Sequence, residues 1–149
     1  MRPFLLAVHI AAGGAGLLLG PLAMAVPKRP GWHPRVGRAY QVAVALLTTS
    51  AVGLVVLEPA LWWLALIGAA TEAAALAGWA VRRRARPRWR PLHLRLMCGS
   101  YVSLVTAFLV VNVSSPLVWV LPTVIAFPLI SLAAKRAARP PRPSIGSVA

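Results

Sequence analysis

The chain is 149 residues long, with 59% hydrophobic and 12% charged residues, whereas soluble domains carry about 25% charged residues, so an ordinary soluble globular fold is excluded. The 16 Lys and Arg residues against 2 acidic residues give a net charge of +14. In a soluble protein this charge would favour nucleic acid as a partner, but here the basic residues flank long apolar segments, so we expect anionic lipid headgroups as partners and no nucleic acid.

Five apolar segments are long enough to cross a bilayer, whose hydrocarbon core of about 30 Å needs roughly 20 helical residues. In chain order they cover residues 3–26, 41–57, 60–81, 94–113 and 116–134. The second is short, and the fifth contains Pro122 and Pro128, which predict a kink. The expected fold is all-α: a polytopic membrane helical bundle of five transmembrane helices, formed by residues 1–138. Residues 139–149, with three prolines and several small residues, are expected to form a disordered cytoplasmic tail.

The basic residues predict how these helices are oriented. Of the 16, all but Arg2 lie between the first and second spans, between the third and fourth, or after the fifth, with Arg95 at the start of the fourth span counted with the loop before it. By the positive-inside rule, we expect the N-terminus outside and the C-terminus in the cytoplasm, as in a multi-pass protein of the bacterial cell (inner) membrane. The segment that ends at Ala23-Met24-Ala25 imitates a cleavable signal peptide. Cleavage there would put the basic loops outside, against the charge rule, so we expect the first span to be retained.

One histidine and one acid lie within the predicted spans. His9 shares a helical face with glycines at positions 13, 16 and 20, and such a small-residue stripe favours close packing and turns His9 toward the bundle. Glu72 is the only acid inside a span, so it should be protonated, paired or next to water. We predict a candidate intramembrane polar site formed by His9 and Glu72. In the structural alternative, both side chains are simply hydrogen-bonded across helices, with these hydroxyl groups as plausible partners of the acid: Thr48, Thr49 and Ser50.

A second candidate site lies at the predicted cytoplasmic face. It consists of residues on one face of the fourth span and in the loop before the second: His33, Arg38, Tyr40, His93, Met97, Ser100 and Tyr101. His33 and His93 would lie at the same membrane surface, where they could ligate haem or a metal or contact a quinone headgroup. The structural alternative is that both are solvated interfacial residues. One haem held by His9 and His93 is excluded, because the two differ in depth by about 20 to 25 Å at the helical rise.

Three segments are similar to a family of bacterial membrane proteins. They are His9-x-x-x-Gly13 followed by Leu17-Leu18-Leu19-Gly20-Pro21, His33-x-x-x-Gly37-Arg38-x-Tyr40, and His93-x-x-x-Met97-x-x-Ser100-Tyr101. Together they resemble the family called domain of unknown function 2306, over roughly residues 4–112. The resemblance implies the architecture and singles out the three histidines, but it implies no activity. Pro34 and Gly99 stand where that family tends to have basic residues, and Glu72 matches no family feature.

These features favour a small, non-enzymatic bacterial membrane protein with a transport or proton-handling role at His9 and Glu72. The first alternative is a redox membrane protein that binds haem or quinone near His33 and His93. The second is a structural subunit that packs against a partner through the glycine stripe of the first span. The chain lacks a phosphate-binding Gly-rich loop, a close cysteine pair and a His-Glu-x-x-His motif, so we expect neither a soluble catalytic site nor a metal-binding site.

Overall fold

A computed structural model of the chain describes residues 1–29, 31–85 and 87–139. Within these residues the chain forms five α-helices, two short 3-10 helices and no strand. In chain order they are α1 (Arg2–Ala25), α2 (Trp32–Leu57), η1 (Pro59–Leu61), α3 (Trp62–Arg84), α4 (Trp89–Asn112), η2 (Pro116–Trp119) and α5 (Leu121–Ala137). The predicted all-α fold is therefore confirmed for this part of the chain. The expected tail lies, apart from Arg139, outside the described residues.

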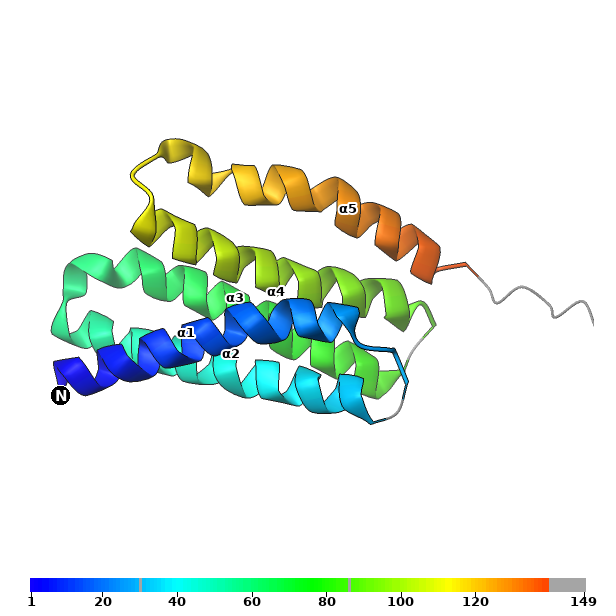
Figure 1. Ribbon diagram of the computed structural model, residues 1–149, viewed down its shortest axis with the longest axis horizontal. Helices are drawn as coiled ribbons and strands as arrows, with labels where there is room; N and C mark the ends of the chain where they lie inside the picture. The colour runs from blue at the N-terminus through cyan, green and yellow to red at the C-terminus, as the bar shows by residue number, and fades with distance from the viewer. Residues whose placement is uncertain (30, 86, 140–149) are drawn as a thin grey trace, which may run out of the picture.

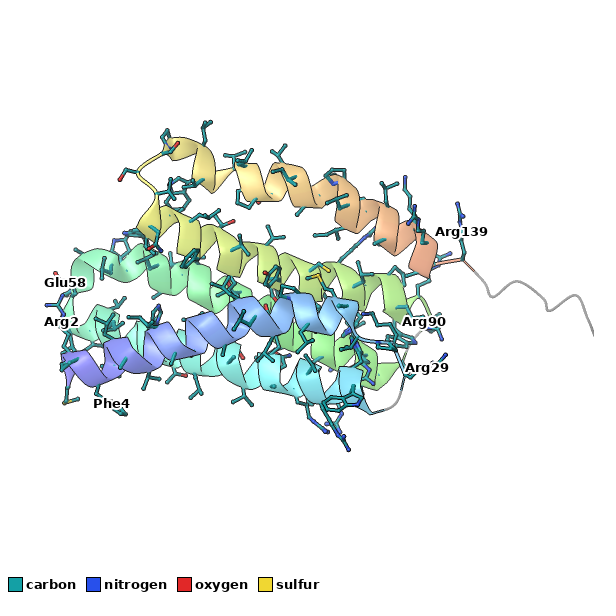
Figure 2. All side chains as sticks on the ribbon, viewed as in Figure 1. Arg2, Phe4, Arg29, Glu58, Arg90 and Arg139 are labelled. Atoms are coloured by element: carbon teal, nitrogen blue, oxygen red, sulfur yellow. The ribbon has the colours of Figure 1, made fainter. Side chains whose placement is uncertain are left out.

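The first four α-helices form a bundle of alternating direction, and α5 lies outside it against α4 (Figure 1). α1 packs on α2, α2 on α3 and α3 on α4, and a contact between α4 and α1 closes the ring. Among the described elements, α5 contacts only α4 and η2. Arg29, Arg90 and Arg139 lie at one end of the molecule, which we call the basic end, while Arg2 and Glu58 lie at the opposite, N-terminal end (Figure 2).

Two helices begin before the apolar spans that we predicted for them. α2 starts at Trp32, so the segment 32–40, which we expected to be a loop, is helical. α4 starts at Trp89 rather than near residue 94. Pro34 and Pro91 fall in these first turns, where a missing backbone N–H costs little because it would have no partner within the helix. The basic segments are therefore mainly helical, and the second span is not short.

The fifth predicted span is interrupted near its start. Residues Pro116–Trp119 form η2, and α5 begins at Leu121. Pro122 lies in the first turn of α5, and Pro128 lies inside the helix. The interruption is thus next to the first of the two prolines that predicted a kink.

The outside of the molecule is apolar, while polar side chains lie inside. Leu18 and Val56 are 77% and 76% exposed, whereas Ser50, Thr71 and Ser100 are buried. Soluble monomers rarely expose so much contiguous apolar surface. Five helical segments in the described chain are long and apolar enough to cross a membrane, with a mean hydropathy between 1.6 and 2.2. This is the composition of a multi-pass transmembrane helical protein.

The glycine stripe of α1 packs against helices of the same chain. A Cβ atom added at Gly16 would lie 3.0 Å from the Leu104 side chain of α4, and one at Gly20 would overlap with the Tyr101 ring of the same helix. Leu104 belongs to the buried core around the middle of the bundle, together with Tyr40, Val44 and Ala75. The stripe is therefore occupied within the chain and is not a free surface for a partner.

Candidate functional site

The two histidines at the basic end each use Nδ1 to bind a backbone carbonyl. His33 Nδ1 on α2 lies 3.0 Å from the carbonyl oxygen of Ala23 on α1, and His93 Nδ1 on α4 lies 2.8 Å from that of Gly78 on α3. A carbonyl oxygen can only accept, so each Nδ1 carries the proton and each Nε2 keeps a lone pair. Both rings therefore present Nε2 as an acceptor or ligand atom.

His33 and His93 belong to one cluster at the basic end. Lys28, Arg82 and His93 are all near enough to His33 for their charges to act on it. The ring of Trp89 meets His93 edge-on, with 6.1 Å between the ring centroids. The structure thus brings together the two histidines that we predicted at one face. The surrounding positive charge favours a neutral or anionic ligand over a bare metal cation.

Lys28 closes the end of α1 beside this cluster. Its Nζ donates hydrogen bonds to the carbonyl oxygens of Ala23, Met24 and Val26. A cation at this position complements the partial negative charge of a helix C-terminus. Burial lowers the pKa of Lys28 from its ordinary value, and Cys98 on α4 acts in the opposite direction. Lys28 therefore caps the C-terminus of α1 and lies close to His33 of the histidine cluster.

Three of the other predicted residues are used in helix packing. The Tyr40 hydroxyl lies 2.9 Å from Ser100 Oγ, and Ser100 Oγ donates to the carbonyl oxygen of Met97 at 3.0 Å, so Tyr40 is the donor to Ser100. Tyr101 donates to the carbonyl oxygen of Leu17 at 3.2 Å. Tyr40 and Ser100 are only 2% and 0% exposed. These groups join α1, α2 and α4, and the enclosed Tyr40 and Ser100 have no access to a ligand at the basic end.

Met97 and Arg38 complete the predicted set. The Met97 sulfur lies against Gly78, where an added Cβ atom would be 2.9 Å away, so this side chain packs between α4 and α3. Arg38 is exposed on α2. Of the seven predicted residues, only His33 and His93 lie in the histidine cluster and also have a ring nitrogen, Nε2, that is free to bind a ligand.

His9, near the N-terminal end, is joined to Ser50 of α2. Its Nδ1 lies 3.1 Å from Ser50 Oγ, and Ser50 Oγ donates to the carbonyl oxygen of Leu47 at 2.9 Å. Because the hydroxyl proton of Ser50 is directed to Leu47, the His9 Nδ1–H must be the donor to Ser50. His9 therefore makes the expected hydrogen bond across helices, and its Nε2 also keeps a lone pair.

Glu72 lies in a different part of the bundle from His9. Its Oε2, together with Oε1 of Gln41, is a buried side-chain oxygen without a hydrogen-bond partner in the described residues. Gln41 Nε2 on α2 donates at 2.7 Å to the carbonyl oxygen of Ala75, which is one helical turn from Glu72 on α3. Glu72 also lies near enough to Tyr40, the neighbour of Gln41, for its charge to act on the hydroxyl.

The acid and the amide therefore lie along the same contact between α2 and α3, and we call them the Glu72–Gln41 pair. The structure bonds His9 to Ser50 and Gln41 to the carbonyl oxygen of Ala75, and among the described residues it forms no hydrogen bond between Glu72 and either His9 or Gln41. Gln41 is not among the residues that the sequence pattern predicts for a site. The signal was present, because Gln41 is the one amide side chain at the start of an apolar span.

No protein-family model, curated protein or solved structure matches the chain. The resemblance to domain of unknown function 2306 therefore stays a prediction. In the part of the chain that the structure describes, no group of three or more His, Cys, Asp or Glu side chains could hold a metal ion. The histidine cluster and the Glu72–Gln41 pair are thus the two places whose local chemistry bears on function.

Proposed function

We propose that the chain is a multi-pass protein of the bacterial inner membrane, with its N-terminus outside and its basic end in the cytoplasm. The tryptophans support a membrane between the two ends of the bundle, because Trp side chains favour bilayer interfaces. Toward the basic end lie Trp32, Trp79 and Trp89, and toward the N-terminal end lie Trp62, Trp63 and Trp119. At the basic end, arginine guanidinium groups lie over three of these rings, at 6.0 Å for Arg35 on Trp32, 4.7 Å for Arg83 on Trp79 and 5.8 Å for Arg90 on Trp89.

Cysteine labelling tests this orientation. Cys98 is the single cysteine, so Cys98→Ser gives a cysteine-free background. With a membrane-impermeant maleimide, Arg2→Cys should react in intact cells in which the outer membrane has been permeabilised. Arg90→Cys should react only after the inner membrane is also opened. The reverse pattern would contradict the proposed orientation.

We further propose that the protein handles protons at the Glu72–Gln41 pair. The observation that supports this is the pair of unpartnered buried oxygens, both of which are acceptors when Glu72 is ionised. One proton bound to Glu72 gives its carboxyl group an O–H donor, and Gln41 Oε1 can accept a hydrogen bond from this donor. Leaving a buried polar group unsatisfied costs about 1–3 kcal/mol, and more for a charged group. We propose that a proton bound here completes a hydrogen bond between the two side chains.

Proton-exchanging groups lie on both sides of the pair. Toward the basic end are the hydrogen-bonded hydroxyl groups of Tyr40 and Ser100, and then the histidine cluster. Toward the N-terminal end are Thr71 and Ser103, whose hydroxyl oxygens are 2.7 Å apart, and then His9. Each hydroxyl group can donate and accept, and each histidine has a free Nε2. We propose that these groups, with water between them, exchange the proton of Glu72 with the two membrane surfaces.

Proton flux in reconstituted vesicles tests this function. The purified protein would be placed in vesicles with a trapped pH-sensitive dye, and a pH difference would be imposed. Glu72→Gln removes the titrating group while keeping size and polarity, so flux should fall to that of empty vesicles. Glu58→Gln is the matched control, because Glu58 is the other acid and is exposed at the N-terminal end. Wild-type flux in Glu72→Gln would remove the proposal.

The histidine cluster favours a second candidate function, the binding of haem or a quinone headgroup. Both Nε2 atoms are unprotonated, as a haem iron requires or as a quinol hydroxyl would need in an acceptor. Basic side chains nearby suit haem propionates. The purified protein should then show a Soret absorbance or bound quinone that is lost in both His33→Ala and His93→Ala. Protein purified without haem, iron or quinone would eliminate this candidate.

Anionic lipid headgroups are the partners that we propose for the basic end. The supporting observation, besides the net charge of +14, is a groove of about 660 Å³ between α4 and α5. Arg95 lines it toward the basic end, and apolar side chains such as Phe127 and Ile130 line the rest. A phospholipid has the matching arrangement of a phosphate above an acyl chain.

A further inference from the structure

The N-terminal half of the four-helix bundle contains a cavity of about 460 Å³. Each helix of the bundle contributes to its wall, with His9 from α1, Thr48 from α2, Gly68 from α3 and Phe108 from α4. This volume lies within the range of about 300–1,000 Å³ that is typical of small-molecule sites, and the space between bundle helices is a common place for them. Neither the histidine cluster nor the Glu72–Gln41 pair lines it.

The cavity ends at the core of the bundle. Leu104 lines it and is only 4% exposed. Leu104 packs with Tyr40, Val44 and Ala75, whose exposed fractions are 2%, 0% and 0%. Packed side chains of this kind leave few voids larger than a water molecule. The cavity is therefore a pocket closed toward the basic end, which suits binding rather than passage.

The cavity is open toward the outside of the bundle between α1 and α4. Ile10 on α1 and Val111 on α4 both line it, and they are 63% and 60% exposed. In this half of the molecule Gly14 also lines the cavity, and a Cβ atom added there would meet nothing within 4 Å. In a bilayer, this opening faces the acyl chains. A molecule dissolved in the membrane could therefore enter from the side.

The wall is mostly aliphatic, and its polar groups are largely engaged. Thr48 donates to the carbonyl oxygen of Gly68 at 3.3 Å. The Thr71 hydroxyl group donates to the carbonyl oxygen of Ile67 at 2.8 Å, and it also lies 2.7 Å from the Ser103 hydroxyl oxygen. His9 differs from these, because its Nδ1 is used by Ser50 while its Nε2 retains a lone pair. A ligand that donates one hydrogen bond and is otherwise apolar would complement this wall.

We propose that this cavity binds one lipid-soluble small molecule with a hydroxyl group, such as a phenol or an alcohol, which donates a hydrogen bond to His9 Nε2. The inference does not rest on proton handling at Glu72. A histidine within a membrane span is costly unless it has a partner or a role, and here one nitrogen has the partner Ser50 and the other would serve the ligand. The proposal gives His9 a function that is separate from that of the two basic-end histidines.

Binding of two matched probes tests the proposal: 4-hexylphenol, which has the hydroxyl donor, and hexylbenzene, which lacks it. Purified protein in lipid nanodiscs would be titrated with each probe, and saturable binding would be followed by the rise in unfolding temperature. The wild type should bind 4-hexylphenol about three- to tenfold more tightly than hexylbenzene, the factor that a net hydrogen bond of ordinary strength supplies. His9→Phe should remove this preference. Equal binding of the two probes to the wild type, or binding of neither, would overturn the proposal.

Two leucine substitutions, one inside the cavity and one outside it, test whether the probe binds in the cavity. A Cβ atom added at Gly68 would meet only the Thr48 side chain, at 3.8 Å, so Gly68→Leu can place its side chain in the cavity. Gly37→Leu is the matched control, because Gly37 is on α2 outside both the cavity and the groove between α4 and α5, and has nothing within 4 Å of an added Cβ atom. Gly68→Leu should abolish probe binding, whereas Gly37→Leu and Glu72→Gln should bind as the wild type does. Unchanged binding in a folded Gly68→Leu variant would place the ligand elsewhere and overturn the proposal.

Discussion

The ring of Tyr101 on α4 fills the space beside Gly20 on α1. A Cβ atom at position 20 would lie closer than 3.0 Å to two carbon atoms of the ring. The ring cannot swing away freely, because its hydroxyl group donates to the carbonyl oxygen of Leu17. This contact sets how closely α1 and α4 approach, and it closes the ring of four helices.

Gly20→Ala should therefore destabilise the protein. The added methyl group would push the Tyr101 ring or separate the helices, and overpacking of this kind typically costs about 1–3 kcal/mol. Reversible unfolding of the purified protein in mixed detergent micelles would measure the change. Gly14→Ala is the control, because its Cβ atom would have nothing within 4 Å and alanine favours the helix. Equal stability of the two variants would show that the close contact does not determine the helix spacing.

The bond between Tyr40 and Ser100 predicts two unequal costs. Tyr40→Phe removes a donor, while Ser100 Oγ still donates to the carbonyl oxygen of Met97, so the loss should be about 0.5–1.5 kcal/mol. Ser100→Ala leaves the fully enclosed Tyr40 hydroxyl without an acceptor, which should cost about 1–3 kcal/mol. Unfolding of both single variants and the double variant gives a double-mutant cycle. A smaller loss in Ser100→Ala than in Tyr40→Phe would contradict this account.

All three histidines should carry their proton on Nδ1 when neutral. Each Nδ1 faces an acceptor, which is Ser50 Oγ for His9 and a backbone carbonyl for His33 and His93. Nitrogen chemical shifts of ¹⁵N-histidine-labelled protein distinguish the two ring nitrogens. Single His→Gln variants would assign the three signals. A protonated Nε2 in His33 or His93 would argue against haem ligation through that atom.

Arg95→Gln should weaken the binding of anionic phospholipid. A basic residue at the membrane surface contributes about 1 kcal/mol to such binding, so the affinity for phosphatidylglycerol should fall about fivefold. Native mass spectrometry at defined lipid concentrations would count the bound molecules. Arg2→Gln removes the same charge at the N-terminal end and is the control. Phosphatidylcholine binding should not change in either variant, and an equal loss for both lipids would show that charge is not the cause.

The number and the approximate positions of the helices could be predicted because they depend on apolar length alone. The starts of α2 and α4 could not, because polar and basic residues such as Arg35 and Arg90 are compatible with both a loop and a helix that extends beyond an apolar span. Pro34 in the first turn of α2 did not indicate where the helix begins, since proline is compatible with both a loop and the first turn of a helix. A boundary of this kind is decided by packing against neighbouring helices, which a single sequence does not display.

The candidate sites were predictable only as sets of residues on common helix faces. The approach of His33 to His93 followed from their expected positions at one membrane surface. The hydrogen bonds from these histidines to the carbonyl oxygens of Ala23 and Gly78 could not be predicted. Every residue has a carbonyl group, and the sequence does not indicate which one lies nearest to each ring. For the same reason, the position of Glu72 along the contact between α2 and α3, rather than against His9, depended on the rotation of α3 about its axis, which the sequence leaves open.

The position of α5 outside the ring has a consequence for biosynthesis. The core residues Tyr40, Val44, Ala75 and Leu104 all belong to the first four helices, and the closing contact is between α1 and α4. Chains are synthesised from the N-terminus, and their early segments can fold before the late ones emerge. Every helix needed to seal the core has therefore been translated while α5 is still inside the ribosome. α5 is then added to a bundle that can already be closed.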